Sequence, residues 1–571
     1  MKCIYISLLI LISGILISCF DIVGFGVEPE LLTQPISATI QNGREASFFV
    51  QVSGDPLPVI SWERSSDGNL WEKIEQATGS KYTFVVQTAD NGALFRVKVG
   101  KIISEIAVLT VVNNGVVSQI NQYGITWTFD KPYQTGSFAN GDYWIVGPIN
   151  IIYIDPVSKN ISGRVKNGSM LNPSPALGIN QGYDNTCVAV NYSSSHNVAF
   201  NVSPSNSLTI STGSLISTIS NEEAWLDTQI KTAAILTVLS SAPASGSFRP
   251  PYCGTTKSIN YNVSQLTSAK YNLLGRLTPV TTIPALSTVE RFFERPWIDH
   301  MTTWSGRVIH PELNMPRYGR DISTNVGIGS LMLHTNFTDT EKETLLIRYL
   351  QLGIDLYGIA QNGGRWYADG GHFSGRKWPI LFAGIMLDDS NMRGIGAKSG
   401  DYVYTSGFGP GNLPPDYIGF GEDDQTFYVT SEDVIRTNST SWSPDTRGGT
   451  PIPYTSGDVG LAEWGIRHAT DPFRDNALWY VYYRNVTGIC WAGFVLSARI
   501  MESNASAMML WNHDALFDYM DRYMAVTAEN SLIPAWRYSV IDMNDIWATH
   551  PGGRQTSSFV ADMWDTYRSS F

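Results

Sequence analysis

Short alternating runs of hydrophobic and polar residues dominate the first part of the chain. Residues 47–52, 59–62 and 90–99 each show the two-residue period of a β-strand with one buried face, and turn dipeptides such as Asn42-Gly43 separate such runs. Short strands with frequent turns are typical of two packed antiparallel sheets. The pattern therefore predicts a small β-sandwich over residues 30–113.

Three features of this segment resemble a bacterial immunoglobulin-like domain. Trp62 stands where that family has the core tryptophan of its third strand, and Asp90–Phe95 looks like the family's D-x-G-x-Y corner with phenylalanine for tyrosine. Val50 and Val97 occupy the positions of the family's paired cysteines. The resemblance implies a sandwich held by hydrophobic contacts without that disulfide, with a role as a spacer.

Strand-like runs also dominate residues 118–280. Residues 124–129 and 143–154 are the clearest examples, and long stretches rich in Ser, Asn, Gly and Pro separate them. We expect a second β domain with long loops. The segment Asn140-Gly141-Asp142 offers polar side chains suited to a site, but this combination is first of all a turn signal, and we interpret it as a turn.

The hydrophobic period changes from two to about 3.6 after residue 280, which predicts helices. The clearest begins at Thr338, where Thr338 and Glu341 form a capping-box pattern, and ends at Asn362-Gly363. Residues 391–454 are rich in Gly, Pro, Asp and Tyr and predict loops over a cleft. We expect a multidomain β + α chain in which residues 281–571 form an α/α toroid of helical hairpins, with a tight helical bundle as the alternative. Further helices are expected at 286–304, 321–336, 376–388, 457–470, 476–502, 506–525 and 556–569.

The opening of the chain has the pattern of a lipoprotein signal peptide. Met1-Lys2 precedes an apolar run over residues 4–17, and the segment then ends in Leu16-Ile17-Ser18-Cys19, which resembles the lipobox of bacterial lipoproteins. The resemblance implies removal of the signal before Cys19, lipidation of Cys19 and export to the bacterial cell envelope, at the outer surface or in the periplasm. Plain secretion is the alternative. The membrane is then a partner only through the lipid anchor.

Charge and composition narrow the classes of ligand. The formal net charge is -12, which argues against nucleic acid, because binding to phosphates requires a basic surface. Aromatic residues make up 12% of the chain, and this suits stacking on sugar rings, although large secreted β domains are also rich in aromatic residues. Outside the cytoplasm Cys187 and Cys253 are available to pair, but their spacing does not establish a disulfide.

Residues 365–378 are the strongest candidate site, because reactive, charged and aromatic side chains stand among glycines between two predicted helices. His372 is a candidate base and Tyr367 a candidate acid or second base. In a uronic-acid polymer the C5 proton becomes acidic only when the adjoining carboxylate is neutralised, and Asn325 is a candidate for that task. His310 and Tyr318 are second-line candidates.

Several cations and aromatic side chains near this loop are candidates for substrate binding. Guanidinium groups match carboxylates in bidentate fashion, although most arginines cap helices or form ordinary ion pairs. Indole rings offer flat surfaces to pyranose rings. The expected carboxylate binders are Arg320, Arg365, Arg376 and Lys377, and the expected stacking surfaces are Trp366 and Trp378.

Carboxylates provide an alternative chemistry. A glycoside hydrolase requires two of them across the scissile bond, and Asp369, Glu422 and Asp424 are available. The acidic residues 422–424 also offer oxygen ligands for Ca²⁺, but their spacing does not match an EF-hand. The sequence has no Cys/His zinc motif, P-loop or dinucleotide fingerprint, so we expect no metal or organic cofactor.

The combination of lipid anchor, immunoglobulin-like spacer, β domain and helical toroid resembles surface polysaccharide-degrading enzymes of bacteria, in particular α/α-toroid polysaccharide lyases. The resemblance implies β-elimination on an anionic, alginate-like uronate polymer. Two alternatives stay open: an inverting glycoside hydrolase on the same toroid, and a non-enzymatic lipoprotein that binds glycans or host matrix.

Overall fold

The computed structural model describes residues 27–113, 115–187, 190–223, 228–399, 416–444, 451–465, 487–529 and 557–571. The chain divides into two compact units, the first formed by Met1–Ala38 with Ser47–Val111 and the second by Thr39–Ala46 with Val112–Phe571. The predicted signal peptide and Cys19 lie outside the described residues. Within the described ranges, no helix has the length and apolar character needed to span a membrane.

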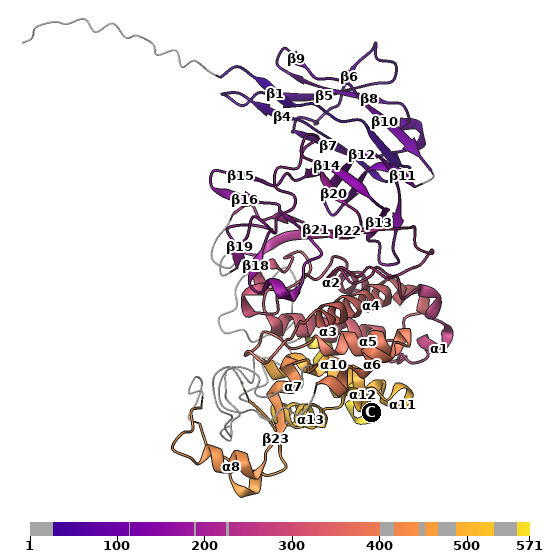
Figure 1. Cartoon of the computed structure of the whole chain (residues 1–571). Coiled ribbons are helices and arrows are strands. Elements are labelled where there is room, and N and C mark those ends of the chain that lie inside the picture. Colours follow the sequence, from indigo (N-terminus) through magenta and orange to yellow (C-terminus); the bar gives the residue numbers. More distant parts are fainter. Residues whose placement is uncertain are drawn as a thin grey trace, which may run out of the picture. The chain divides into compact units, whose positions relative to one another are not determined.

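The first unit is an immunoglobulin-like β-sandwich (Figure 1). In one sheet β8 (Leu94–Val99) pairs with β5 (Ile60–Ser65) and with β10 (Ala107–Val112), and across from it β3 (Glu45–Phe49) pairs with β7 (Lys81–Val85). These strands place alternate apolar side chains inside, as the two-residue period predicts. This confirms the predicted sandwich.

The core of the sandwich is aromatic. The rings of Phe48 and Phe95 stack with centroids 4.5 Å apart, and the indole of Trp62 is buried beside Phe48 with its Nε1 donating to the carbonyl of Gly79 at 2.9 Å. Val50 and Val97 are both buried, at the positions where the resemblance implies hydrophobic contacts in place of a disulfide.

The second unit begins with a large sheet. Its strands follow the order β17-β21-β22-β13-β12-β14-β20, with β11 paired to β12, and β13 and β22 are the parallel neighbours in this antiparallel arrangement. Trp127, Ile145 and Leu236 lie in its core. The strands are β11 (Val116–Gln122), β12 (Ile125–Ser137), β13 (Tyr143–Val146), β14 (Ile149–Asp155), β17 (Ser169–Leu171), β20 (Leu208–Ile210), β21 (Gly213–Ser220) and β22 (Ile230–Leu239).

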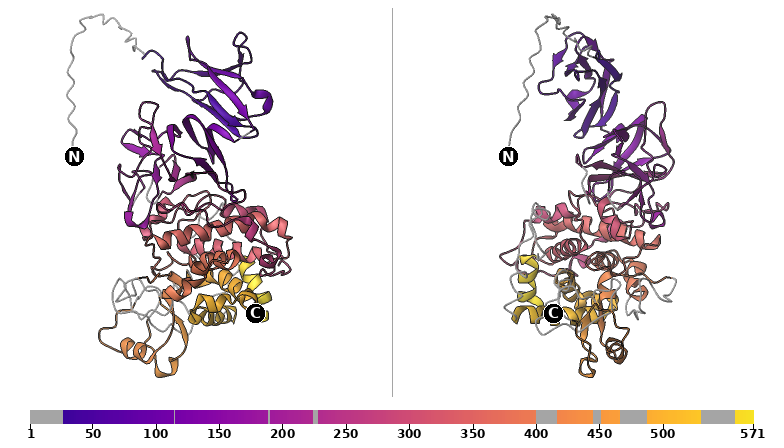
Figure 2. Two further views of the ribbon diagram at one scale, coloured as in Figure 1. Left: turned by 45° about the vertical axis from the view of Figure 1, so that its right-hand side comes forward. Right: turned by 90° about the vertical axis from the view of Figure 1, so that its left-hand side faces the viewer.

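Helices dominate the second unit after the large sheet, and in both views of Figure 2 most of them make one packed group, from which α8 (Ser431–Thr437) stands apart. The predicted capping box is present, because the Thr338 hydroxyl accepts from the Glu341 amide at 3.2 Å and the Thr338 amide donates to the Glu341 carboxylate at 2.8 Å. Every residue of α3 is buried, and α3 packs against α2, α4, α10 and α14. The main helices are α2 (Leu286–Phe292), α3 (Gly319–Leu333), α4 (Asp339–Gln361), α5 (Lys377–Leu387), α10 (Ala492–Ile500), α13 (Asp514–Glu529) and α14 (Ser558–Tyr567).

Three of the expected helices differ from the structure. The described part of 457–470 contains β24 (Ala462–Trp464), which pairs with β23 (Thr426–Tyr428), and residues 466–470 lie outside the described ranges. The helix expected at 286–304 ends at Phe292. The helix expected at 506–525 is broken at Asn512, whose φ of 60° is left-handed. The structure shows a helical C-terminal part, and its arrangement as a toroid stays a prediction.

A buried ion-pair network joins the sheet and the helices of the second unit. The Arg249 guanidinium donates to Asp142 at 2.7 Å and to Asp355 of α4 at 3.0 Å, and all three side chains are buried. Asp142 lies in the turn between β12 and β13, where Gly141 has a φ of 91°. This confirms the turn interpretation of Asn140-Gly141-Asp142.

We expect Arg249→Ala to lower the free energy of unfolding by about 3–5 kcal/mol, because two buried carboxylates lose their shared partner. Arg276→Ala is the matched control, since Arg276 and Asp339 pair at the surface and exposed pairs contribute about 1 kcal/mol or less. Urea unfolding followed by tryptophan fluorescence measures both variants. Similar losses in the two would contradict the role given to Arg249.

Candidate active site

The loop between α4 and α5 is held from inside by the carboxylate of Asp299. Arg376 Nε donates to its Oδ2 at 2.9 Å and Arg376 Nη2 donates to its Oδ1 at 3.2 Å. Trp366 Nε1 donates to Oδ2 at 3.0 Å, and His310 Nε2 lies 3.0 Å from Oδ1. Burial alone raises the pKa of Asp299, but Arg376 and His310 lower it well below its usual range. The carboxylate is therefore an ionised anchor for both ends of the loop.

Arg376 also binds the backbone around His372. Its Nη1 donates to the carbonyls of His372 at 3.2 Å and Ser374 at 2.9 Å. A guanidinium has five N–H donors in a fixed plane, so one buried arginine can hold the carboxylate and the loop together. Arg376 therefore holds the loop from within the protein, and its donors are directed to Asp299 and to backbone carbonyls.

A short acidic helix, α7 (Gly421–Gln425), holds the other side of the loop. Glu422 Oε2 accepts from the amide of Gly375 at 3.0 Å, and Asp424 Oδ2 accepts from the amide of Ala368 at 3.0 Å. Gln425 Nε2 donates to the carbonyl of Gly370 at 2.8 Å. The carboxylate oxygens of Glu422 and Asp424 thus accept from backbone donors of the loop. In the described part of the chain, no group of three His, Cys, Asp or Glu side chains is placed to hold a metal ion.

Lys377 forms the second buried ion pair of this region. Its ammonium pairs with Asp423 of α7 and donates to the carbonyl of Trp511 at 2.7 Å. Burial lowers the pKa of Lys377, opposed by Asp423. Arg376 and Lys377 are neighbours in the sequence, and they pair with Asp299 and Asp423. The start of α5 is therefore held by two carboxylates that lie far apart along the chain.

The anchored loop brings His372 next to Tyr318, at the residue before α3. The two rings meet edge to face with centroids 4.8 Å apart. Glycines allow this approach, since a Cβ on Gly319 would lie 1.9 Å from the carbonyl oxygen of His372, and a Cβ on Gly371 would lie 2.5 Å from the Tyr318 hydroxyl. Both ring-bearing residues are only partly buried. A histidine and a phenol thus share one partly accessible position.

Arg320 brings positive charge to the same place. Its guanidinium carbon lies 5.4 Å from the centroid of the Tyr318 ring, and its Nε donates to Asp321 at 2.9 Å. The pKa of Arg320 is raised because Asp321 outweighs the effect of burial, so Arg320 is a permanent cation. Of the predicted carboxylate binders, Arg320 lies over the Tyr318 ring, while Arg376 contacts the backbone carbonyl of His372.

The other predicted binding residues have different surroundings. Trp366 and Trp378 are fully buried, with Trp366 stacked on Phe420 at 5.7 Å and Trp378 stacked on Trp511 at 6.0 Å. Neither indole presents a face to a sugar, because both rings are core side chains; this corrects the expected stacking role.

The described hydrogen bonds of Arg365 and Asn325 do not include His372 or Tyr318. Arg365 donates to the carbonyls of Ala360 at 3.1 Å and Gly364 at 2.6 Å, so it caps the end of α4. Asn325 is buried on α3, and within the described ranges its amide Nδ2 has no hydrogen-bond partner.

Two further predicted site residues, Tyr367 and Asp369, lie in the loop itself. Tyr367 is partly buried, with its ring against Gly419: a Cβ there would lie 2.3 Å from the ring. Asp369 is also partly buried, and its carbonyl accepts from the amide of His372 at 3.1 Å. Tyr367 and Asp369 therefore belong to the same short loop as His372, while the described ring contacts of His372 are with Tyr318 and Phe373.

Glu422 is an unusual carboxyl group. It is fully buried, and among the described residues its Oε1 has no hydrogen-bond partner. Burial and the nearby charge of Asp423 raise the pKa of Glu422 to about 7. A carboxyl group in such surroundings keeps its proton near neutral pH, as general acids do.

Sequence reasoning missed Asp299 and placed Tyr318 and His310 among its second-line candidates. Asp299 stands in an irregular segment after Trp297, where no period or motif marks it as an anchor. Tyr318 carries a weak signal, because it precedes the glycine that opens α3. His310 is buried against Asp299, which makes it part of the anchor and not a surface catalyst.

Comparison with known proteins gives short matches. No protein-family model matches the chain. Endoglucanase C of Cellulomonas fimi is 31% identical over 87 residues, which is 14% of this chain and 8% of that protein. The chain therefore matches only a small fraction of the length of this relative.

Solved structures with a matching region contain immunoglobulin domains. A titin–obscurin-like 1 Ig complex is 23% identical and covers 15% of this chain and 93% of that chain, with a TM-score of 0.13. The N-terminal Ig1-2 module of the Drosophila receptor protein tyrosine phosphatase DLAR is 16% identical and covers 37% and 98%, with a TM-score of 0.15. The strand pairing and the aromatic core of the first unit by themselves define its sandwich fold.

We expect Glu422→Gln to remove one pH-dependent part of the stability. In the window from about pH 4.5 to 7 the folded protein keeps the Glu422 proton and the unfolded chain releases it, so wild-type stability falls as pH rises, by at most about 1.4 kcal/mol per pH unit. The unfolding free energy of the variant minus that of wild type should rise across this window. Urea unfolding at pH 5, 6, 7 and 8 measures it.

Glu432→Gln on exposed helix α8 (Ser431–Thr437) is the control for the same charge change. A difference curve for Glu422→Gln that is as flat as that of the control would show that Glu422 titrates normally.

Proposed function

We propose that the chain is a carbohydrate-active enzyme, and that the site around His372 cleaves a uronic-acid-containing polysaccharide by β-elimination. The observation that carries the proposal is the edge-to-face contact of His372 and Tyr318 at 4.8 Å, with the Arg320 guanidinium over the same phenol ring at 5.4 Å. A base, a phenolic acid and a cation are the three groups that this reaction requires.

The reaction assigns a separate task to each group. The imidazole of His372 takes the C5 proton, and the C5–H electron pair forms the C4–C5 double bond while the C4–O bond breaks. The phenol of Tyr318 gives its proton to the departing oxygen. Arg320 neutralises the carboxylate at C6, which stabilises the charge that develops at C5. Asn325 is the expected second neutralising group.

The structure changes the choice of acid relative to the sequence-based hypothesis. Tyr318 contacts His372 directly, while the ring of Tyr367 packs on Gly419. Tyr318 is therefore the first choice, and Tyr367 of the same loop is the second. Arg376 and Lys377 act as positioning residues, because both are buried in ion pairs.

An inverting glycoside hydrolase is the second candidate, with Glu422 as acid and Asp369 as base. Two observations favour it: the pKa of Glu422 is about 7, and the short match to endoglucanase C is to a protein named for hydrolysis. The burial of Glu422 weighs against it, since an acid must reach the glycosidic oxygen.

The rest of the chain fits a protein that is exported and acts on a polysaccharide outside the cytoplasm. We propose that Cys19 carries the lipid anchor in the bacterial envelope and that the immunoglobulin-like unit is the spacer. An anionic polysaccharide is the proposed partner, and the reaction as written uses no cofactor.

One assay separates the candidates. Residues 20–571 are incubated with alginate, polygalacturonate and neutral glucans while absorbance near 235 nm and reducing ends are followed. New absorbance indicates a lyase, and reducing ends without absorbance indicate a hydrolase. Retention of the polymer without turnover indicates a binding protein.

We expect His372→Ala and Tyr318→Phe each to lower kcat by about 10²–10⁴-fold, because each removes a proton-transfer group. Tyr367→Phe should have a smaller effect. His196→Ala in the β-rich part is the matched control and should be as active as wild type. Full lyase activity in Tyr318→Phe with loss in Tyr367→Phe would reverse the choice of acid.

A further inference from the structure

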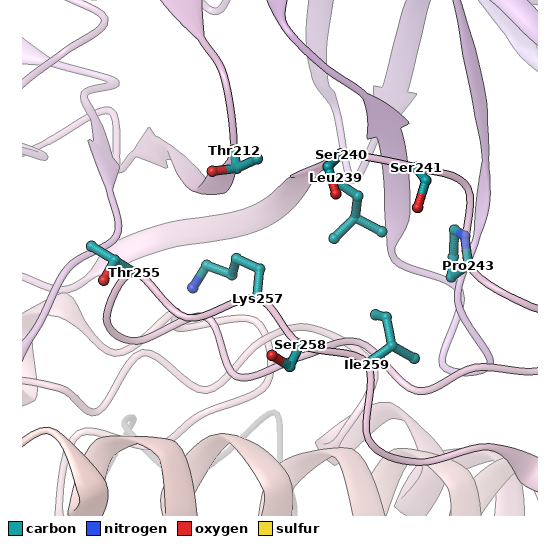
Figure 3. A pocket seen from close by; sticks show the side chains of 9 residues that line it. All are labelled: Thr212, Leu239, Ser240, Ser241, Pro243, Thr255, Lys257, Ser258 and Ile259. Carbon is teal, nitrogen blue, oxygen red and sulfur yellow. The ribbon is translucent and has the colours of Figure 1, made fainter.

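A pocket separate from the His372 loop opens beside the end of β22. Its volume is about 420 Å³, and three chain segments line it. Thr212 and the segment of Ser240 and Ser241 face the segment of Thr255, Lys257 and Ser258 across the opening (Figure 3). Five of these six side chains carry hydroxyl groups and the sixth is a cation, and the apolar side chains of Leu239, Pro243 and Ile259 complete the lining.

Lys257 is held in a fixed position at this pocket. Its ammonium donates to the carbonyls of Pro251 at 2.9 Å, Tyr252 at 3.0 Å and Gly254 at 2.7 Å. Within the described ranges, no carboxylate lies at ion-pair distance from it. The acidic group that acts on it, Asp355, is already paired with Arg249. The positive charge of Lys257 is therefore solvated by carbonyl dipoles but lacks a counter-anion.

These features fit one kind of ligand. Hydroxyl groups donate to and accept from the hydroxyls of a sugar. The three donors of Lys257 already bind backbone carbonyls, so it attracts a carboxylate through its uncompensated charge. We infer that the pocket is a second saccharide site, which binds the uronate residue of an anionic glycan with its carboxylate near Lys257. The choice of a uronate rests on the proposed function; the pocket itself is built from residues outside the candidate active site.

Binding of an anion here is linked to a proton. Burial and the charge of Arg249 lower the pKa of Lys257 to about 7, opposed by Cys253 and Asp355. A bound carboxylate favours the charged ammonium, so binding takes up a proton when the pH exceeds about 7. The affinity should therefore be highest below pH 7 and fall by up to about tenfold per pH unit above it.

The test is binding of D-glucuronate to residues 20–571 by isothermal titration calorimetry or ligand-observed NMR at pH 6, 7 and 8. His372→Ala serves as the background, so that binding at this pocket is measured without turnover. Lys257→Met should weaken binding at least tenfold, and Lys231→Met, at an exposed position of β22, should leave it unchanged. Ser241→Trp should block the pocket without touching the Lys257 hydrogen bonds and should abolish binding at an unchanged Tm.

Two further ligands identify the chemistry, and the outcomes are distinct. D-Glucose and inorganic sulfate should each bind at least tenfold more weakly than D-glucuronate. Equal binding of glucose would overturn the role of Lys257, and stronger binding of sulfate would overturn the saccharide assignment. Undiminished D-glucuronate binding by Ser241→Trp would place the sugar elsewhere. Failure of the lyase assay with intact, Ser241-dependent binding would reject the proposed reaction and retain this site.

Discussion

The candidate active site depends on a carboxylate that solvent does not reach. Moving an ionised group into the protein interior is costly, and Asp299 is stable there because donors from Arg376, Trp366 and His310 surround it. Those donors stand at both ends of the loop and in a separate irregular segment. The position of His372 is thus fixed by electrostatics inside the protein, even though its ring is near the surface.

The same arrangement explains where the positive charges of this region are used. A cluster of cations in an acidic protein suggests an anionic ligand, and the loop offers Arg365, Arg376 and Lys377. Arg376 and Lys377 neutralise buried aspartates, and Arg365 caps the end of α4. Arg320, itself paired with Asp321, is the cation whose guanidinium lies over the Tyr318 ring. The charge of Arg320 is therefore partly compensated by Asp321.

The sequence predicted those features that depend on neighbouring residues, and it did not predict those that depend on contacts between distant segments. Strand alternation around Trp62 and the capping box at Thr338 are local patterns, and both appeared as expected. The strand Ala462–Trp464 exists because it pairs with Thr426–Tyr428, a contact that local periodicity does not contain. The candidate site shows the same difference between local and long-range information. The loop was recognisable from its composition. The contact between His372 and Tyr318 depends on Asp299, Gly319 and Gly371, which only the folded chain brings together.

The network of Arg249, Asp142 and Asp355 changes the meaning of the module boundary suggested near residue 280. The arginine and one carboxylate lie before that point in the sequence and the other carboxylate lies after it. A chain cut there would leave buried Asp355 without its guanidinium partner in the helical fragment, while Arg249 would keep only Asp142 in the other fragment. The sheet and the helices are therefore one structural unit, and a replacement for either part would need the matching buried charge to keep this network.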